Sequence, residues 1–281
     1  MKDTLLPMNH LSISRIGTPL VTALAVLFLL PIAASASVLM LDFGPTTVAP
    51  ADQTNSPYHT VNTSFSDTAW NKIEITNPAS LVYSDGSAAT GVTLTLGSSP
   101  NSTVVDFSSL PTHSNALGTQ IGTGVFAGTS VGRDGIYRGN VGSQNNQVAL
   151  KIGGVTAGTY EIYVVGLNTN TRISDQSPMN FYAAATGDVS TFDTGGLTPD
   201  ATTLITANTP WMEGGSYGKI TVDLAAGQYL VLVSDGAGSE SRGFLNSVQI
   251  VAIPEPSTVI LGLAGCFSLI ALRRVSRRRA A

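Results

Sequence analysis

The residue types that most often perform chemistry are sparse in this 281-residue chain and form no recognisable catalytic motif. Outside the N-terminal leader the histidines are His59 and His113, and neither accompanies a Gly-x-Ser-x-Gly elbow or a His-Glu-x-x-His helix. We expect both to be ordinary loop residues at the surface. Asp42-Phe43-Gly44 copies the magnesium tripeptide of kinases in letters alone, because no phosphate-binding loop or catalytic loop accompanies it. This segment is predicted to be a strand end followed by a turn.

Paired carboxylates offer the remaining route to catalysis, since glycoside hydrolysis uses two acidic side chains at a fixed separation. The acidic candidates are Asp175, Asp188, Asp193 and Glu213. Their distances along the chain say nothing about their distances in space, and no constellation meets the geometric requirements of catalysis. The sequence therefore predicts a protein that is not an enzyme, with a glycan hydrolase or lyase as the less favoured alternative.

Calcium is the one cofactor that the composition suggests, because an acidic, loop-rich β domain offers hard oxygen ligands, for example near Asp134 or Asp235. No loop carries a defined series of calcium ligands. The predicted metal content is none.

Sugar binding by a β domain uses an aromatic ring that stacks on the pyranose face and polar groups that bond to its hydroxyls. The side chains that we select for glycan contact are Tyr137, Arg138, Trp211, Glu213 and Tyr217. Core packing is the alternative role for Trp211, and bracing of loops is the alternative for the others.

Charge separates the ends of the chain from its centre. The net charge of the whole chain is −4, but residues 37–253 carry 7 Lys and Arg against 16 Asp and Glu, a net charge of −9. Nothing in this part could neutralise nucleic-acid phosphates, so no nucleic-acid partner is expected. The one cysteine, Cys266, lies outside the central part, which therefore has no disulfide and no cysteine metal cluster.

The N-terminal segment has the features of a secretory signal peptide spanning residues 1–36. An apolar run from 20 to 32 follows a basic leader, and Ala34 and Ala36 supply the small side chains that signal peptidase requires. Cleavage is predicted before Ser37. A retained membrane anchor is the alternative.

The C-terminal segment predicts a short transmembrane helix over residues 257–272, which is almost wholly apolar or small. A basic cluster follows at once and would remain in the cytoplasm. Its members are Arg273, Arg274, Arg277, Arg278 and Arg279. Everything between the two ends would then lie outside the inner membrane.

Pro254-Glu255-Pro256, followed by this helix and the arginine cluster, resembles the PEP-CTERM sorting signal over residues 253–279. The resemblance implies a substrate of exosortase, a membrane-embedded transpeptidase-like enzyme of Gram-negative bacteria that make extracellular polysaccharide and biofilm matrix. It implies that the tripeptide is the recognition motif and that the arginines stop transfer. A permanent C-terminal anchor is the alternative.

Residues 37–252 predict an all-β domain, because short runs of alternating apolar residues are punctuated by glycine turns. The clearest strands are 92–96, 148–152, 160–164, 220–224, 229–233 and 248–250. Two segments, 151–160 and 219–229, share a strand, an Ala-Gly turn and a second strand that begins with Tyr. The domain loosely resembles galactose-binding-like or malectin-like jelly rolls, which implies an antiparallel β-sandwich. We expect one sandwich; two small ones are the alternative.

These features together predict an exported protein, sorted through the inner membrane to the cell surface or extracellular matrix. Signal peptidase and exosortase would process it, and extracellular polysaccharide is a possible partner. A structural or adhesive role is the expected function. A carbohydrate-binding module is the alternative, and a glycan-active enzyme is the third reading.

Overall fold

A computed structural model of the protein describes residues 37–47, 54–116, 124–126, 131–139, 146–168, 178–204, 210–237 and 242–254. The described part is all-β, as predicted, with a five-residue helix α2 (Pro57–Val61) and a short 3-10 helix at Gly124–Phe126. Residues Ala36–Glu255 form one compact unit. No helix within the described residues is long and apolar enough to span a membrane, and the predicted span at 257–272 lies outside them.

One sheet of the sandwich has five strands and contains both ends of the domain. Its order is β12 (Gly218–Leu224), β8 (Gly158–Val165), β15 (Ser247–Ile253), β1 (Val38–Phe43) and β2 (Asn71–Ile73). The pairs from β12 to β1 are antiparallel, whereas β1 and β2 are parallel. The predicted antiparallel sandwich therefore contains one parallel pair, at this edge, where the long connection from 44 to 70 lets β2 run in the same direction as β1.

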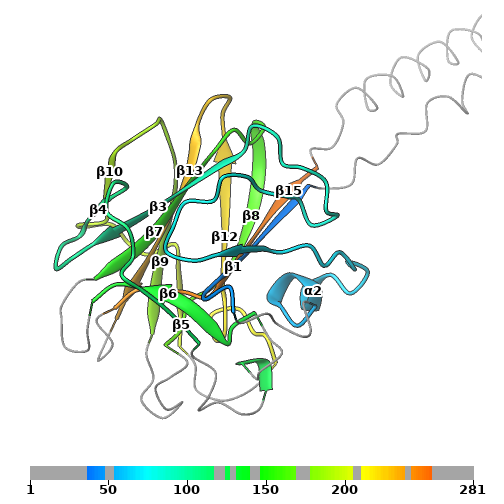
Figure 1. Ribbon diagram of the computed structural model, residues 1–281, viewed down its shortest axis with the longest axis horizontal. Coiled ribbons are helices and arrows are strands. Elements are labelled where there is room, and N and C mark those ends of the chain that lie inside the picture. The colour runs from blue at the N-terminus through cyan, green and yellow to red at the C-terminus, as the bar shows by residue number, and fades with distance from the viewer. Residues whose placement is uncertain are drawn as a thin grey trace, which may run out of the picture. The chain divides into compact units, whose positions relative to one another are not determined.

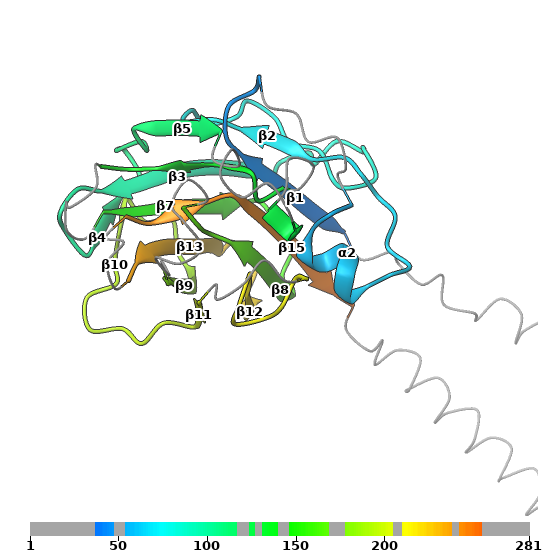
Figure 2. The same cartoon turned by 90° about the horizontal axis from the view of Figure 1, so that it is seen from below.

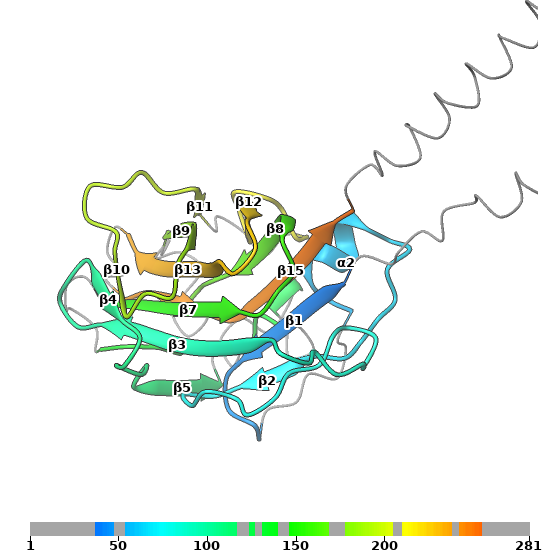
Figure 3. The ribbon, with the colours of Figure 1, turned by 90° about the horizontal axis from the view of Figure 1, so that it is seen from above.

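The second sheet has seven strands. Its order is β10 (Thr191–Asp193), β4 (Val104–Asp106), β3 (Thr93–Ser99), β7 (Gln147–Gly153), β13 (Tyr229–Gly236), β9 (Met179–Thr186) and β11 (Ala201–Thr203). A three-stranded sheet contains β14 (Phe244–Leu245), β6 (Asp134–Tyr137) and β5 (His113–Ala116). Strands β1 and β15 run obliquely to β3 and β7, as the views from above (Figure 3) and from below (Figure 2) both show.

A single hydrophobic core lies between the two large sheets. Alternate side chains of the five-stranded sheet, such as Leu41 and Ile162, share it with Leu96, Leu150 and Leu232 of the seven-stranded sheet. Because the core draws on strands from β1 to β15, both halves of the predicted domain belong to one sandwich. Each strand expected from alternation coincides with an observed strand, and only the one expected at 92–96 begins a residue too early, since β3 starts at Thr93.

The two similar strand-turn-strand segments both carry the chain from one sheet to the other. The first leads from β7 in the seven-stranded sheet to β8 in the five-stranded sheet, and the second leads back from β12 to β13. The turn after β7 includes Gly154, whose φ of +75° and close approach to the Gly91 carbonyl leave no room for a side chain. The shared sequence pattern therefore marks a sheet crossing.

The outer face of the five-stranded sheet is covered by a second apolar cluster. Helix α2 lies beside β1 and β15 (Figure 1), and its Tyr58 ring packs 5.3 Å from the Tyr163 ring of β8. Trp211 belongs to the same cluster. This outer layer leaves room for polar side chains near the β1–β2 edge, where the candidate site lies.

Candidate functional site

A charged residue interrupts the apolar strand β1. Leu39, Leu41 and Phe43 point into the core, so the intervening Asp42 lies on the opposite face of the sheet. In the parallel pair, Asp42 is directly opposed to Lys72 of β2. The Asp42 side chain is 1% exposed, and such a group needs a close partner because burial of an unpaired charge is costly.

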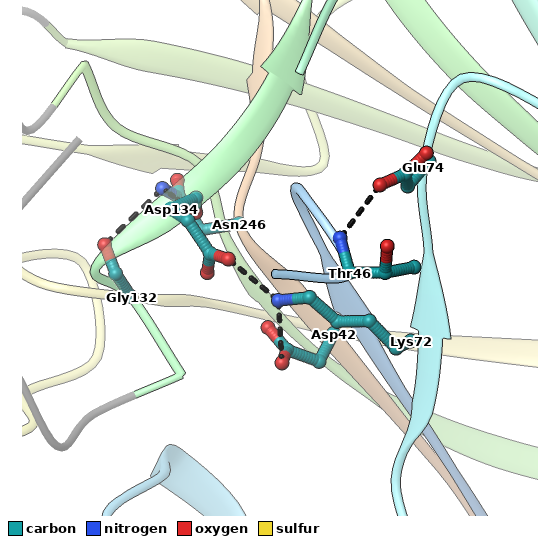
Figure 4. Close-up of polar contacts among 7 residues, drawn as sticks. All are labelled: Asp42, Thr46, Lys72, Glu74, Gly132, Asp134 and Asn246. Carbon is teal, nitrogen blue, oxygen red and sulfur yellow. Dashed lines mark hydrogen bonds and ion pairs between the residues drawn. The ribbon is translucent and has the colours of Figure 1, made fainter. Parts of the chain in front are cut away.

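Lys72 supplies that partner and reaches a second buried acid. Its Nζ lies 2.9 Å from Asp42 Oδ2 and 2.5 Å from Asp134 Oδ2, and Asp134 is also 1% exposed. The Lys72 side chain retains 21% exposure, and its ammonium lies between the two carboxyl groups (Figure 4). We call Asp42, Lys72 and Asp134 the buried charge cluster.

The backbone around Asp134 is held by buried polar contacts. Asn246 Nδ2 donates to the carbonyl oxygens of Asp134 and Gly132 at 2.7 and 3.2 Å (Figure 4). Gly44 lies beside the Asp134 carboxyl, and a Cβ at Gly44 would overlap it. These contacts fix the start of β6 against the end of β1, which sets the position of the second acid.

Burial dominates the electrostatics of the cluster. It raises the pKa of Asp42 to about 7, and repulsion from Asp134 adds to the increase while Lys72 opposes it. Burial also raises the pKa of Asp134, against the attraction of Lys72 and Arg133. Near neutral pH, the Asp42 carboxyl group is therefore protonated in a substantial fraction of the molecules.

One buried oxygen of the cluster, Asp42 Oδ1, lacks a hydrogen-bond partner among the described residues. The position between the carboxylates that a metal ion would take is filled by the Lys72 ammonium. Within the described residues, no three His, Cys, Asp or Glu side chains are grouped so that they could hold a metal. Asp134 and Asp235, the positions named for calcium, thus lack an assembled ligand set there.

The aromatic side chains selected for glycan contact are largely buried. Trp211 is 7% exposed; its ring packs edge-on against Phe126 at 5.4 Å, and its Nε1 donates to Asn55 Oδ1 at 2.9 Å. Tyr217 is buried in the same outer cluster. Tyr137 belongs to the core cluster between the sheets, in β6, and its ring is stacked on His113 at 4.7 Å. These rings have packing roles, and glycan contact through them stays a prediction.

The two polar residues selected with them also lie apart. Arg138 follows β6, and its Nη1 donates to Ser98 Oγ, Ser109 Oγ and the Leu110 carbonyl, which braces the adjacent loop. Glu213 is exposed in a turn, where it forms a β-bridge with Tyr217. The structure thus brings together Trp211, Glu213 and Tyr217 near one turn, and Tyr137 and Arg138 elsewhere.

The expectation for the histidines was wrong. His59 is buried in α2, where Ser56 Oγ lies 2.6 Å from Nδ1 and the Asp67 carbonyl oxygen lies 2.8 Å from Nε2. His113 is part of β5 rather than a loop. The Ser56–His59 contact has the atoms of a nucleophile and its base, but Ser56 is fully buried, so the contact serves to fix α2 in place.

The acidic candidates for catalysis each make separate contacts. Asp188 pairs with Lys151 at 2.5 Å, and Asp193 accepts a hydrogen bond from Thr103 Oγ1 at 2.9 Å. Asp175 lies outside the described residues. The acids that do lie close together, Asp42 and Asp134, were not selected as a pair. The sequence feature that could have indicated this pair is the aspartate within the apolar run Val38–Phe43, because a carboxylate buried in such a strand requires a cation nearby.

Two of the predicted processing residues are described. Ser37 is exposed directly before β1, and Pro254 is exposed directly after β15. The signal-peptide residues, including Ala34 and Ala36, lie outside the described residues, as do Glu255, Pro256 and the five arginines.

No family model matches the chain, and no curated protein matches it. Among solved structures, a family GH115 4-O-methyl-α-glucuronidase is similar over 51% of this chain and 17% of its own, with 12% identity and a TM-score of 0.29. The K1 adhesin domain of Lys-gingipain from Porphyromonas gingivalis W83 is similar over 57% of this chain and 99% of its own, with 16% identity and a TM-score of 0.30. An isomalto-dextranase from Arthrobacter globiformis T6 is similar over 57% of this chain and 23% of its own, with 16% identity and a TM-score of 0.26. Likenesses this slight support no argument about function.

Proposed function

We propose that this protein is an exported component of the cell surface or extracellular matrix, with a structural or adhesive β-sandwich of the jelly-roll type. A secretory signal would be removed before Ser37, and a sorting signal over residues 253–279, whose tripeptide begins at Pro254, would be processed by an exosortase. The acting part would be the sandwich between these two positions.

The observation that carries this proposal is the coincidence of the predicted processing positions with the limits of the β-structure. Strand β1 begins at Val38, one residue after the predicted signal cleavage, and β15 ends at Ile253, one residue before the Pro-Glu-Pro tripeptide. A cut before Ser37 and a cut at the tripeptide would therefore leave every residue of β1 and β15 in the domain, as expected for segments that serve delivery and not folding.

The pairing of the two end strands strengthens the same point. Val38 is opposed to Val251 in the antiparallel β1–β15 pair, and the Ala252 N–H donates to the Ser37 carbonyl at 3.2 Å. The first and last strands of the domain are thus neighbours in the middle of one sheet, and the start of β1 lies beside the end of β15. Processing at either end would leave these strands held by neighbours on both sides.

A non-catalytic role agrees with the described chemistry. Asp42 and Asp134, which share one lysine, are both buried with Lys72 between them, and a sugar ring would have no access to carboxyl groups so enclosed. The aromatic rings near the Trp211 turn are packed rather than presented.

Mass spectrometry of the protein isolated from the surface of its native host tests the proposal. The expected N-terminus is Ser37, and the expected C-terminus lies close to the tripeptide. Replacement of Ala36 by Leu should block the first cut, and replacement of Glu255 by Ala should block the second, whereas Thr258→Ser serves as the matched control. Surface material that retains Met1 and Ala281 would contradict the proposal.

A further inference from the structure

The buried charge cluster brings together the three groups that an amide-forming reaction needs. Lys72 supplies a primary amine, Asp42 supplies an acyl carbon, and Asp134 supplies a second carboxyl group in contact with the same nitrogen. We propose that Lys72 Nζ and Asp42 Cγ join in an intramolecular amide bond, with Asp134 as the group that moves the protons. This inference is independent of the sorting function proposed above.

The fold holds the reacting groups in contact. Asp42 and Lys72 are directly opposed in the β1–β2 register, and the amine nitrogen lies 2.9 Å from Asp42 Oδ2. Groups held at such a distance by rigid strands react at effective concentrations far above those of free solutes, because the entropy of bringing them together has already been lost on folding. Ordinary lysine and aspartate side chains in solution form no amide because they lack this arrangement.

Burial favours the product. Two carboxylates and an ammonium out of contact with water carry a desolvation cost, whereas an amide is neutral. Each acid is 1% exposed, so bulk water is largely excluded from the site. Once the water molecule formed with the amide has left, hydrolysis of the amide would require a water molecule to enter again.

The step balances without a further reactant. The Lys72 ammonium passes a proton to the Asp134 carboxylate, 2.5 Å away, and the neutral amine attacks Cγ of protonated Asp42. As the C–N bond forms, the nitrogen gives up a second proton, and Asp134 relays it to the departing hydroxyl group while the C–OH bond breaks. The products are one amide, one water molecule and Asp134 in its protonated form, which keeps the proton that the ammonium released.

The assignment of Asp42 as the acyl group follows from its state of protonation and its position. A carboxylate cannot lose oxygen as water, so the acid that is attacked must be neutral, and burial raises the pKa of Asp42 to about 7. Its Oδ1 has no hydrogen-bond partner among the described residues, so no donor stabilises its charged form on that side. Asp134 makes the shorter contact with the amine and is the better placed to take its proton.

The bond would staple a domain that has no disulfide. The one cysteine, Cys266, lies in the C-terminal segment, outside residues 37–253. Strand β2 has three residues and lies at the end of its sheet, next to β1. A covalent link from Lys72 to Asp42 would tie this edge strand to the middle of the sheet.

The test is the intact mass of the protein, isolated as its host or expression strain makes it and then fully denatured. We expect the chain to be lighter, by the mass of one water, than the mass calculated from its own mapped termini. Digestion should yield a branched peptide that joins the segments around Asp42 and Lys72. Lys72→Arg, Asp42→Ala and Asp134→Ala should each restore the calculated mass.

The chain provides a matched control. Lys151 lies 2.5 Å from Asp188, the same distance as Lys72 from Asp134, but Asp188 is 64% exposed. Lys151→Arg should therefore leave the deficit of one water unchanged.

Three outcomes would overturn the proposal. A folded wild-type chain with its full calculated mass would do so, and this result does not depend on any variant being folded. A deficit that persists in Lys72→Arg would show that the lysine is not involved. A branched peptide that joins Lys72 to Asp134 would refute the assignment of Asp42.

Discussion

Lys72 and Asp42 are opposed across a parallel pair of strands, and the lysine ammonium meets the buried carboxyl at 2.9 Å. This contact allows a buried carboxyl group to lie within the apolar strand β1, because the lysine compensates its charge. Since Asp134 approaches the same nitrogen, loss of the lysine would leave two buried acids without their cation. The stability of the β1–β2 edge should depend on Lys72 more than on any exposed ion pair.

Replacement of Lys72 by Met should lower the free energy of unfolding by about 3 to 5 kcal/mol, because an uncompensated buried charge remains. Lys219→Met is the control, since the Lys219–Glu161 pair is similar in distance but more exposed, and should cost no more than about 1 kcal/mol. Urea unfolding followed by circular dichroism measures both. Equal effects of the two substitutions would contradict the importance of the buried charge cluster.

The pH dependence of stability should carry a contribution from Asp235. Burial raises the pKa of Asp235 above the ordinary value of 3.8 for an aspartate, while hydrogen bonds from Gln147 and Gly236 oppose the increase. From about pH 4 upward the unfolded chain then binds fewer protons at this residue than the folded chain does. The contribution to stability is therefore full at lower pH and is lost as the pH rises through the folded pKa.

Asp235→Asn should flatten this part of the curve, because the amide does not titrate and its oxygen can still accept the bond from Gln147. The free energy of unfolding in urea, measured at a series of pH values, gives the slope. Asp223→Asn, at an exposed position of β12, is the control. A slope that is unchanged in Asp235→Asn would contradict the prediction.

The first sheet crossing should tolerate no side chain at Gly154. Gly154 and Gly227 have nearly the same φ, +75° and +78°, so a change to alanine strains the backbone at both sites by about 1 to 3 kcal/mol. A Cβ at Gly154 would also overlap the Gly91 carbonyl oxygen, whereas nothing lies within 4 Å of a Cβ at Gly227. Gly154→Ala should therefore lower the melting temperature more than Gly227→Ala. The reverse order would show that the close approach is easily relieved.

Substitutions at Trp211 can distinguish a packing role of its ring from a role in ligand contact. Trp211→Ala should cost about 3 to 5 kcal/mol of stability, because a buried ring is removed from the outer apolar cluster. Trp211→Phe keeps a ring against Phe126 and loses the hydrogen bond to Asn55, which should cost about 1 kcal/mol.

Glycan-array binding of the folded Trp211→Phe variant then tests the predicted sugar contact directly. We expect binding, where the wild type shows any, to be unchanged in this variant. A selective loss of binding with little loss of stability would instead support a sugar-binding role for Trp211.

Alternation of apolar residues was sufficient to locate much of the fold. The strands around Leu96, Leu150 and Ile162 were predicted because a half-buried strand has a period of two. Strand β9 was missed, since its run Ala183-Ala184-Ala185 lacks the branched and aromatic side chains that mark a strand. The recurring Ala-Gly turn was recognised, but its role as a sheet crossing depends on pairing between distant strands.

By itself, the sequence determined the all-β class and the strands that alternate, because both depend on residues close together in the chain. The buried charge cluster was decided by the tertiary structure alone. Asp42 lies 30 positions from Lys72, and Lys72 lies 62 from Asp134. No local pattern encodes a contact over such separations, since it arises from the parallel register of β1 and β2 and from the approach of β6. The same reason explains His59, whose burial follows from the packing of α2 against a distant sheet.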